Sequence, residues 1–416
     1  MKFAVSPFAP AQFPDLPTVR GVRAATASRG FYEKAGLSRD DTFLFAFPPR
    51  THCAGVFTQS TTASADVAWC RQALETGAGQ ARGLVVNSGN SNAFTGAKGV
   101  LKNEMTLAAL KAALNAPKDT CFLAATGVIG EPLEDANYIG AVVPQMAGAL
   151  TAPDWQACAR AFMTTDTYPK GAGATCQIDG VTVSLAGIAK GSGMIAPNMA
   201  TMLAYVFTDA AIAPDVLDRL LRDAASASFN AITVDSDTST SDTLMVFATG
   251  ESGAPLITDI NDPRLQPFAS ALSDVCRNLA WQIVKDGEGA TKFISITVTG
   301  GETDRSARIM AADIANSPLV KTALAAGDAN WGRVVMAVGK SGEPVDLARL
   351  AIWFGDTQVA AAGGRAEDYD EDAAMAECAK PEIHIRVVVG DGAGEARVYT
   401  CDLTHAYIDI NGAYRT

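Results

Sequence analysis

Histidine and closely spaced cysteine are scarce in this chain of 416 residues. Only His52, His384 and His405 are present, so a histidine-based metal site or a Ser-His-Asp triad has few candidates. The eight cysteines are spread out, and no pair has the CxxC spacing of zinc ribbons or redox motifs. We therefore expect buried, reduced thiols and no metal site.

Long apolar runs are also absent. No segment reaches the roughly 18 apolar residues that a membrane span needs, and Pro7, Pro10, Pro14 and Pro17 interrupt the region where a signal peptide would lie. Lys and Arg number 33 against 45 Asp and Glu, giving a net charge of −12. Such an acidic surface repels phosphate backbones. These features predict a cytoplasmic globular protein that binds neither membranes nor nucleic acid.

Strand-like and helix-like segments alternate along the chain. Apolar residues at helical spacing predict helices over 101–114, 214–224 and 268–284, whereas 84–86 and 293–298 are typical of strands. No Pro- or Ser-rich linker divides the sequence. We expect a layered α/β protein with central sheets.

Two glycine-containing segments near the end of the chain carry further expectations. Gly390-Asp391-Gly392-Ala393-Gly394 lies between two apolar runs and predicts a hairpin turn. The last residues, 408–416, do not have the composition of a floppy tail. We expect them to be ordered, in a site or in core packing.

The most unusual segment spans residues 187–203 and contains a lone lysine, Lys190. Its glycines and lysine are in the wrong order for a phosphate-binding P-loop, and no GxGxxG is completed. Thr201 in this segment is either a buried strand residue or a nucleophile. A threonine hydroxyl needs activation, and its own α-amine, with a pKa of about 7.7–8.0, would serve. That amine exists only if the bond after Ala200 is cut, and these residues alone leave both interpretations open.

The segment 190–203 closely resembles the self-cleavage and nucleophile motif of the ornithine acetyltransferase family, also called glutamate N-acetyltransferases. Further blocks similar to those of the family follow in the same order, from about residue 20 to the end of the chain. These blocks are 87–93, 126–130, 163–167, 233–240, 286–292, 327–333 and 410–416.

The resemblance implies a reaction and an organisation of the chain. The precursor would cut itself between Ala200 and Thr201 into an α chain, 1–200, and a β chain, 201–416, which stay in one fold. Thr201 would take the acetyl group from N2-acetylornithine, release ornithine and pass the acetyl group to glutamate, in a ping-pong cycle of arginine biosynthesis. The family also implies an α/β sandwich of the N-terminal-nucleophile-like aminopeptidase type, an α2β2 heterotetramer and no cofactor. Whether acetyl-CoA is a second donor stays open.

Individual site residues are carried over from the family motifs. Thr126, through its hydroxyl, and Gly127, through its backbone N–H, would form the oxyanion hole. Lys190 would pair with the α-carboxylate common to both substrates. Glu288 would hold an ammonium group or orient the Thr201 amine. The remaining expected substrate contacts are Thr167, Asn411 and Thr416.

Five of these residues also have an ordinary structural alternative. Thr126 could make local hydrogen bonds in a loop, and Lys190 and Glu288 could be solvated surface residues. Asn411 and Thr416 could belong to a packed terminal strand.

Three other functions compete with acetyl transfer. A related self-cleaving aminopeptidase or amidase would release the acyl group to water, and an uncleaved amino-acid-binding protein would keep only the fold. A transferase of the same family in a secondary pathway would use other acceptors. Departures from the family pattern leave substrate preference slightly open, and they are Ala125, Ser236, Ser241, Asp409 and Gly412.

Overall fold

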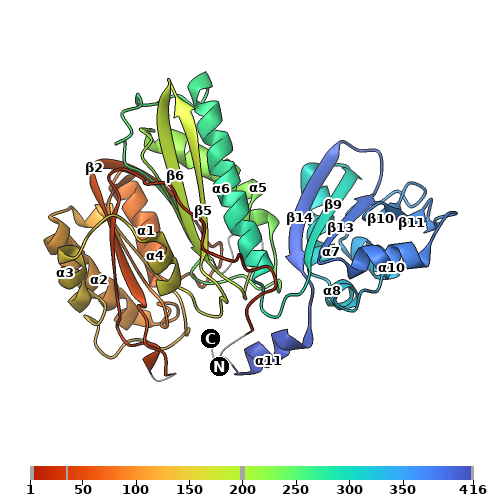
Figure 1. Cartoon of the computed structure of the whole chain (residues 1–416), viewed down its shortest axis with the longest axis horizontal. Helices are drawn as coiled ribbons and strands as arrows, with labels where there is room; N and C mark the ends of the chain where they lie inside the picture. Colours follow the sequence, from red (N-terminus) through yellow and green to blue (C-terminus); the bar gives the residue numbers. More distant parts are fainter. Residues whose placement is uncertain (1–3, 34–35, 197–201, 414–416) are drawn as a thin grey trace.

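Two β-sheets organise the computed structural model, which describes residues 4–33, 36–196 and 202–413 (Figure 1). The larger, eight-stranded sheet has the order β4-β3-β2-β8-β7-β6-β5, with β1 beside β2. The smaller sheet has the order β12-β11-β10-β13-β9-β14. The expected layered α/β architecture is confirmed. More than one sheet was expected, but the point at which the chain begins the second sheet was not predicted, because no change of composition marks it.

The elements have the following bounds. The larger sheet contains β1 (Arg23–Ala27), β2 (Thr42–Phe57), β3 (Gln80–Asn87), β4 (Cys121–Ala125), β5 (Lys170–Ile178), β6 (Val181–Lys190), β7 (Leu203–Thr208) and β8 (Thr243–Ala248). The smaller contains β9 (Phe293–Gly301), β10 (Ala351–Phe354), β11 (Thr357–Ala361), β12 (Gly364–Arg365), β13 (Glu382–Val388) and β14 (Gly394–Cys401). The α-helices are α1 (Ala65–Thr76), α2 (Gly96–Leu114), α3 (Val143–Gly148), α4 (Trp155–Ala161), α5 (Pro214–Ala227), α6 (Gln266–Lys285), α7 (Asp304–Ala315), α8 (Pro318–Ala325), α9 (Trp331–Lys340), α10 (Glu371–Ala379) and α11 (His405–Ala413).

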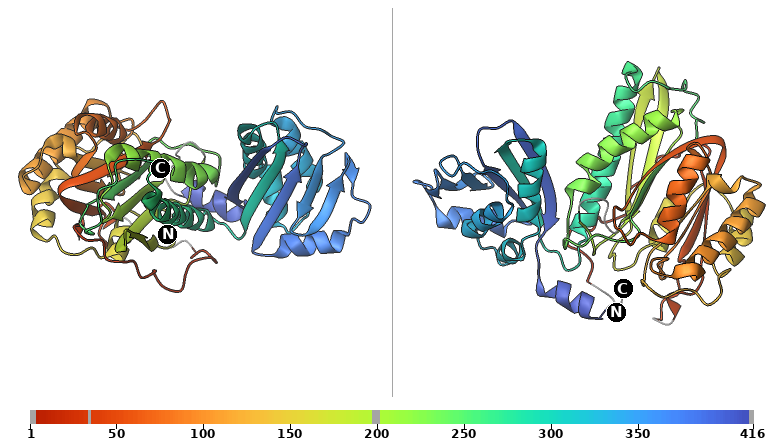
Figure 2. Two further views of the ribbon diagram at one scale, coloured as in Figure 1. Left: turned by 90° about the horizontal axis from the view of Figure 1, so that it is seen from above. Right: turned by 180° about the vertical axis from the view of Figure 1, so that it is seen from behind.

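Strand β2 connects the two parts of the larger sheet, which packs one face against an aromatic core. Its first part pairs with β3 and its last part with β8, with an irregularity between Ala46 and Thr51. The rings of Phe45 on β2 and Phe207 on β7 face each other across this core, with centroids 4.4 Å apart. The outer face of β5 to β8 is covered by α5 and α6, which lie side by side (Figure 2).

The predicted helices and strands are confirmed with small shifts at their ends. Helix α6 starts with Pro267 in its first turn, a position where the missing N–H costs nothing. It buries Phe268, Leu272, Val275 and Leu279, which recur at the helical period. Burying each such side chain contributes about 1.5–3 kcal/mol, so this stripe fixes the helix against the sheet. Seven of the eight cysteines are buried, as predicted.

In the sequence, the predicted cleavage point falls after β6 and before β7, which are neighbouring strands of the sheet. β6 and β7 run antiparallel, with Lys190 opposite Leu203. β7 and β8 lie between β2 and β6 in the sheet order, so the two strands that follow residue 200 are flanked on both sides by strands that precede it. Ala200 and Thr201 lie outside the described residues, and the division into chains 1–200 and 201–416 stays a prediction.

The hairpin predicted at 390–394 is wrong. β13 and β14 are not neighbours, because β9 lies between them, parallel to β13 and antiparallel to β14. The glycines serve a different purpose: a Cβ on Gly392 would lie 2.0 Å from the carbonyl oxygen of Gly301. The loop therefore crosses directly over another backbone, which only glycine permits.

The alternative of a packed terminal strand is also wrong for the described residues, because 405–413 form helix α11. The hydroxyl of Thr404 anchors the start of this helix by donating to the carbonyl of Gly289 over 2.8 Å. None of its residues is buried, and Figure 1 shows it below the two sheets, near both ends of the chain. Residues 408–413 are ordered in this helix, as expected, but without core packing.

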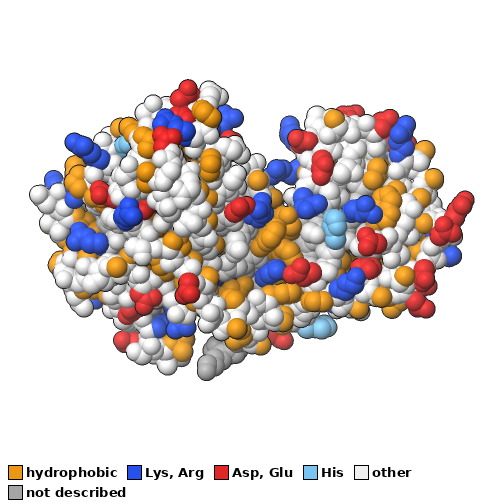
Figure 3. Space-filling model, turned by 45° about the horizontal axis from the view of Figure 1, so that its top comes forward, with side chains coloured by type: hydrophobic (Ala, Val, Ile, Leu, Met, Phe, Trp, Pro, Cys, Tyr) orange, Lys and Arg blue, Asp and Glu red, His pale blue; other side chains and the backbone are white. Residues whose placement is uncertain are grey.

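Acidic and basic side chains are interspersed over the face shown in Figure 3. A notch in this face separates the part built on the larger sheet from the part built on the smaller sheet. None of the helices in the described part of the chain is long and apolar enough to span a membrane.

Candidate active site

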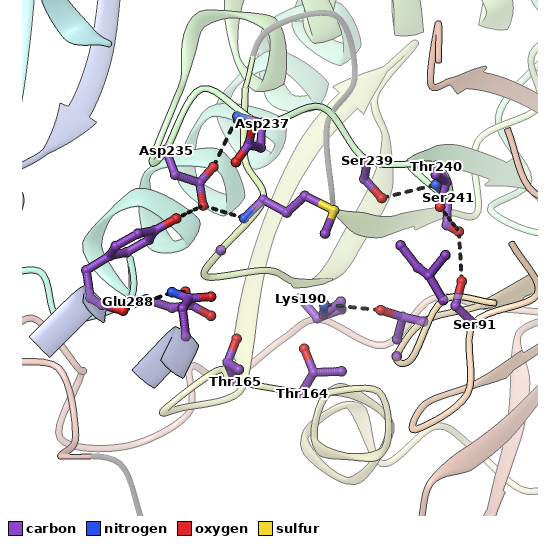
Figure 4. Close-up of a pocket in the computed structure, with 17 residues that line it drawn as sticks. Ser91, Thr164, Thr165, Lys190, Asp235, Asp237, Ser239, Thr240, Ser241 and Glu288 are labelled. Carbon is purple, nitrogen blue, oxygen red and sulfur yellow. Dashed lines mark hydrogen bonds between the residues drawn. The ribbon is translucent and has the colours of Figure 1, made fainter. Parts of the chain in front are cut away.

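The structure brings Thr126, Gly127, Lys190, Glu288 and Asn411 together around one pocket of about 200 Å³. They come from parts of the sequence up to 285 residues apart, which is the difference between 411 and 126. Figure 4 shows Asp235 and Glu288 at one end of this pocket, Ser91 and Ser241 at the other, and Lys190 between them. The pocket therefore contains a cation, carboxylates and hydroxyl groups.

Lys190, the last residue of β6, supplies the cation. It is only 3% exposed, so the alternative of a solvated surface lysine is wrong. Its Nζ donates a hydrogen bond to Oγ1 of Thr126 over 3.3 Å. Burial lowers the pKa of Lys190, and the nearby Asp166 opposes this shift. An anionic ligand would offset the cost of burying this ammonium group.

Thr126 and Gly127 follow directly after β4. The N–H of Thr126 continues the strand pairing by donating to Asn87 O over 3.0 Å. Gly127 has a φ of +133°, and a Cβ there would lie 2.5 Å from the backbone of Gly89. Its N–H has no hydrogen-bond acceptor among the described residues. The turn thus requires glycine and leaves one backbone donor available.

Glu288 is 8% exposed, in a loop between two glycines, so it is not a solvated loop residue. Its Oε2 accepts a hydrogen bond of 2.6 Å from Asn411 Nδ2 on α11. Burial raises the pKa of Glu288, and the Asn411 hydrogen bond opposes this shift. A Cβ on Gly193 would lie 2.5 Å from the Glu288 carboxylate, so the carboxylate fills the space of a missing side chain.

Asp235 lies at the same end of the pocket as Glu288 and holds the backbone of Met194 and Ile195 in place. Its two carboxylate oxygens accept hydrogen bonds from the N–H groups of Met194, over 2.6 Å, and Ile195, over 2.9 Å. The hydroxyl of Tyr407 donates to the same carboxylate over 3.3 Å. Asp235 and Tyr407 were not singled out in the sequence, although the block 233–240 contains the aspartate.

A buried ion cluster lies behind the pocket. Lys170 Nζ is 2.6 Å from carboxylate oxygens of both Asp166 and Asp286, and all three side chains are fully buried. Asp166 also accepts from the N–H of Gly191 over 2.7 Å, and Asp286 accepts from the N–H of Thr167 over 2.9 Å. The cluster thereby connects the three segments that carry Thr165, Lys190 and Glu288.

Thr167 does not line this pocket. Its hydroxyl donates to Asp286 and accepts from the N–H of Ser6 over 3.0 Å. It lies instead beside a second cavity, of about 380 Å³, on the other side of Glu288. Thr165, two residues earlier, lines the pocket.

Three of the predicted residues, Ala200, Thr201 and Thr416, lie outside the described residues. The chain re-enters the structure at Met202, which lines a small cavity together with Thr126 and Lys190. In the described part of the chain, no three His, Cys, Asp or Glu side chains are placed to hold a metal ion.

A pocket of this size, with a buried ammonium group, a carboxylate and hydroxyls, suits a small polar molecule. Comparison with known proteins agrees with this class of site. The profile of the ArgJ family matches residues 23–416. The arginine biosynthesis bifunctional protein ArgJ of Agrobacterium fabrum is 52% identical over the full length of both chains. ArgJ of Gluconobacter oxydans is 52% identical over 99% of this chain and 96% of its own. The chain belongs to the ArgJ family.

Solved structures match as well. The crystal structure of ArgJ from Bacillus halodurans is 37% identical and covers 50% of this chain and 98% of its own, with a TM-score of 0.49. That of ornithine acetyltransferase complexed with ornithine, from Mycobacterium tuberculosis, is 29% identical and covers 43% and 92%, with a TM-score of 0.37.

Proposed function

We propose that this protein is a glutamate N-acetyltransferase of arginine biosynthesis. It moves the acetyl group from N2-acetylornithine to glutamate through an ester on Thr201, after cutting itself between Ala200 and Thr201. The observation that carries this proposal is the buried Lys190 ammonium in one pocket with Thr126 and Glu288. A cation for an α-carboxylate and an anion for an ammonium group are what an amino-acid substrate requires.

Lys190 sets the role of Thr126. An ammonium group has only donors, so Oγ1 of Thr126 must accept the hydrogen bond from Lys190. The hydroxyl proton of Thr126 is then free to point elsewhere. Together with the unpaired N–H of Gly127, it supplies two donors for the oxyanion that forms when the Thr201 hydroxyl attacks the acetyl carbonyl.

The two half-reactions use the same groups in turn. In the first, the α-amine of Thr201 takes the hydroxyl proton and gives it to the nitrogen of ornithine as the acetyl–nitrogen bond breaks. In the second, the amine of glutamate attacks the acetyl ester and loses a proton to the α-amine of Thr201, which returns that proton to the Thr201 hydroxyl oxygen as the ester bond breaks. Lys190 pairs with the α-carboxylate in both. Glu288, oriented by Asn411, suits an ammonium group of the substrate or of Thr201.

Five further parts of the proposal rest on family membership. Three concern the whole protein: an α2β2 assembly of chains 1–200 and 201–416, a cytoplasmic location and a reaction without a cofactor. Two concern the substrates: Thr416 as a substrate contact and acetyl-CoA as a second acetyl donor. Thr167 stays a proposed contact only through its shared loop with Thr165, since its hydroxyl is engaged by Asp286.

The test is to incubate the purified protein with N2-acetylornithine, with and without glutamate, and to measure ornithine. Release that depends on glutamate, with ping-pong kinetics, supports the proposal. If ornithine is released at the same rate without glutamate, the acetyl group is transferred to water and the protein is an amidase. Transfer to other acceptors in preference to glutamate would identify a transferase of another pathway, and no release at all would point to a binding protein.

Replacing Thr126 by valine should lower kcat by about 10²–10³, since one oxyanion donor is lost while the shape is kept. Steady-state kinetics with N2-acetylornithine measures this change, and KM should change much less. Thr120→Val is the matched control, because Thr120 is a buried threonine at the other end of β4. An unchanged kcat in Thr126→Val would remove Thr126 from the oxyanion hole.

A further inference from the structure

A second buried lysine, Lys102 on α2, lies behind the turn formed by Thr126 and Gly127. It is 5% exposed and is set back from the lining of the active-site pocket. Its Nζ donates a hydrogen bond to Oδ1 of Asn87 over 3.2 Å and lies 3.6 Å from Oδ2 of Asp66. Burying an ammonium group is costly even beside a carboxylate, and an apolar side chain of similar volume avoids that cost. What the ammonium group adds is therefore the bond that it donates.

This bond fixes the orientation of the Asn87 side chain. An ammonium group has only donors, so the amide oxygen of Asn87 faces Lys102 and the amide nitrogen points the other way. That nitrogen donates to the carbonyl of Asn90 over 2.9 Å. The bond closes a loop, 87–90, at the end of β3. A reversed amide would set two donors against each other and would leave the carbonyl of Asn90 without this donor.

The loop 87–90 is the surface on which the turn with the oxyanion donors rests. The backbone oxygen of Asn87 accepts from the N–H of Thr126 over 3.0 Å. A Cβ on Gly127 would lie 2.5 Å from the carbonyl carbon of Gly89 and 2.6 Å from the nitrogen of Asn90. The backbone of Gly127 thus lies directly against that peptide bond. A shift of the loop would also shift the N–H of Gly127.

The segment that follows the loop is anchored to the same two helices. The amide nitrogen of Asn92 donates to Oδ1 of Asp66 on α1 over 2.8 Å and to Oδ1 of Asn103 on α2 over 2.9 Å. All three side chains are buried. Ser91, just before this anchor, lines the pocket (Figure 4). The buried polar side chains on α1 and α2 therefore hold the wall of the pocket beside the oxyanion donors.

We propose that Lys102 is a positioning residue for the oxyanion hole. Through the amide of Asn87 it holds the loop 87–90, on which Gly127 rests, and so keeps the N–H of Gly127 in place for the oxyanion. It acts through these groups without touching the substrate. This inference rests on the proposed role of Thr126 and Gly127 in acetyl transfer.

The experiment measures kcat and KM for N2-acetylornithine in Lys102→Met, per amount of chain cut at 200. We expect kcat to fall by about 10- to 100-fold, because a displaced donor loses most of its effect although it is still present. KM should stay within about twofold of wild type, because the oxyanion exists only in the transition state.

Asn87→Asp tests the same path at its next residue. The aspartate keeps the shape and the oxygen that accepts from Lys102, but it cannot donate to the carbonyl of Asn90. It should lower kcat and spare KM in the same way. This variant decides the question if Lys102→Met does not fold.

Lys321→Met is the matched control. Lys321 on α8 is 3% exposed, and its Nζ donates to Oγ1 of Thr400 over 2.8 Å, at the end of β14. The change removes the same group from an equally buried position. Its thermal stability should fall, as in Lys102→Met, but kcat per cut chain should stay at the wild-type value.

A double variant separates positioning from mere stabilisation. If Lys102 acts through the oxyanion hole, Lys102→Met should lower kcat less in the Thr126→Val background than in the wild type, because part of the hole is already lost. A lysine that only stabilises the fold would give losses that multiply.

Four results would overturn the inference about Lys102. They are an unchanged kcat in Lys102→Met, an unchanged kcat in Asn87→Asp, an equal fall of kcat in Lys321→Met, and losses that multiply in the double variant. An unchanged kcat in Thr126→Val, or a wild type that releases no ornithine, would instead overturn the proposed function. The Thr126→Val and wild-type measurements thus distinguish the two failures.

Discussion

The Thr201→Ala variant should remain one polypeptide of 43.2 kDa and lose acetyl transfer. Both reactions use the same hydroxyl oxygen, once against the Ala200 carbonyl and once against the acetyl group. Without this oxygen neither bond can form, and no free α-amine appears. Loss of the nucleophile in a comparable hydrolase costs on the order of 10⁶ in kcat. Denaturing intact-mass spectrometry and the ornithine assay measure the two effects on one preparation.

Thr201→Ser is the control for this experiment. Serine keeps the hydroxyl group and, after the cut, the α-amine, so this variant should still mature and transfer, more slowly than wild type. Two wild-type chains, one of which begins at Thr201, complete the expected pattern. A single uncut wild-type chain would remove the amine base and contradict the mechanism.

Lys170→Met should destabilise the protein by about 3–5 kcal/mol, the cost of leaving buried charges without their partner. Asp166 and Asp286 would then face each other without the ammonium that lies 2.6 Å from each. Thermal unfolding followed by circular dichroism measures the loss. Lys285→Met serves as the control, because Lys285 pairs with the largely exposed Glu382, and such surface pairs contribute at most about 1 kcal/mol.

The pH dependence of this difference has a definite sign. In the wild type, Lys170 holds the pKa of Asp166 below its usual value despite burial. Asp166 thus contributes stability above its unfolded pKa, about 3.9, and this stability is lost as the pH falls through the folded pKa. In the variant, protonation at acid pH relieves the unpaired carboxylates. The stability gap should therefore begin to narrow as the pH falls toward about 4, because burial raises the pKa of the unpaired carboxyl groups of the variant, and it should narrow further below pH 4 as the wild type loses the contribution of Asp166. A gap that is absent at pH 7 would contradict the cluster's role.

Sequence patterns predicted the local elements well, because each has its own periodic signal. The buried stripe of α6 is one example. They failed where pairing over long distances decides the outcome. Residues 390–394 have hairpin composition, yet β9 inserts between β13 and β14. No local feature of 382–401 reports the strand formed some 90 residues earlier, at 293–301.

Prediction of the site from sequence has the same limit, because contacts between distant residues decide which side chains face the pocket. Family motifs identified Thr126, Gly127, Lys190, Glu288 and Asn411, which the structure gathers around one pocket. They could not distinguish Thr165 from Thr167 in a run of polar residues. Which hydroxyl faces the pocket depends on Asp286, 119 residues away from Thr167, which engages the latter.

The position of β7 and β8 between earlier strands of the larger sheet has a consequence for genetics and for assembly. β7 and β8 pair with each other, and the outer edge of each pairs with a strand that precedes residue 200: β8 with β2 and β7 with β6. A cut at 200 would therefore yield two polypeptides that cannot dissociate without breaking the hydrogen bonds between these strands. Folded molecules would not exchange their α and β chains on mixing. Two alleles, one defective before residue 200 and one after it, would not rescue each other by swapping matured halves.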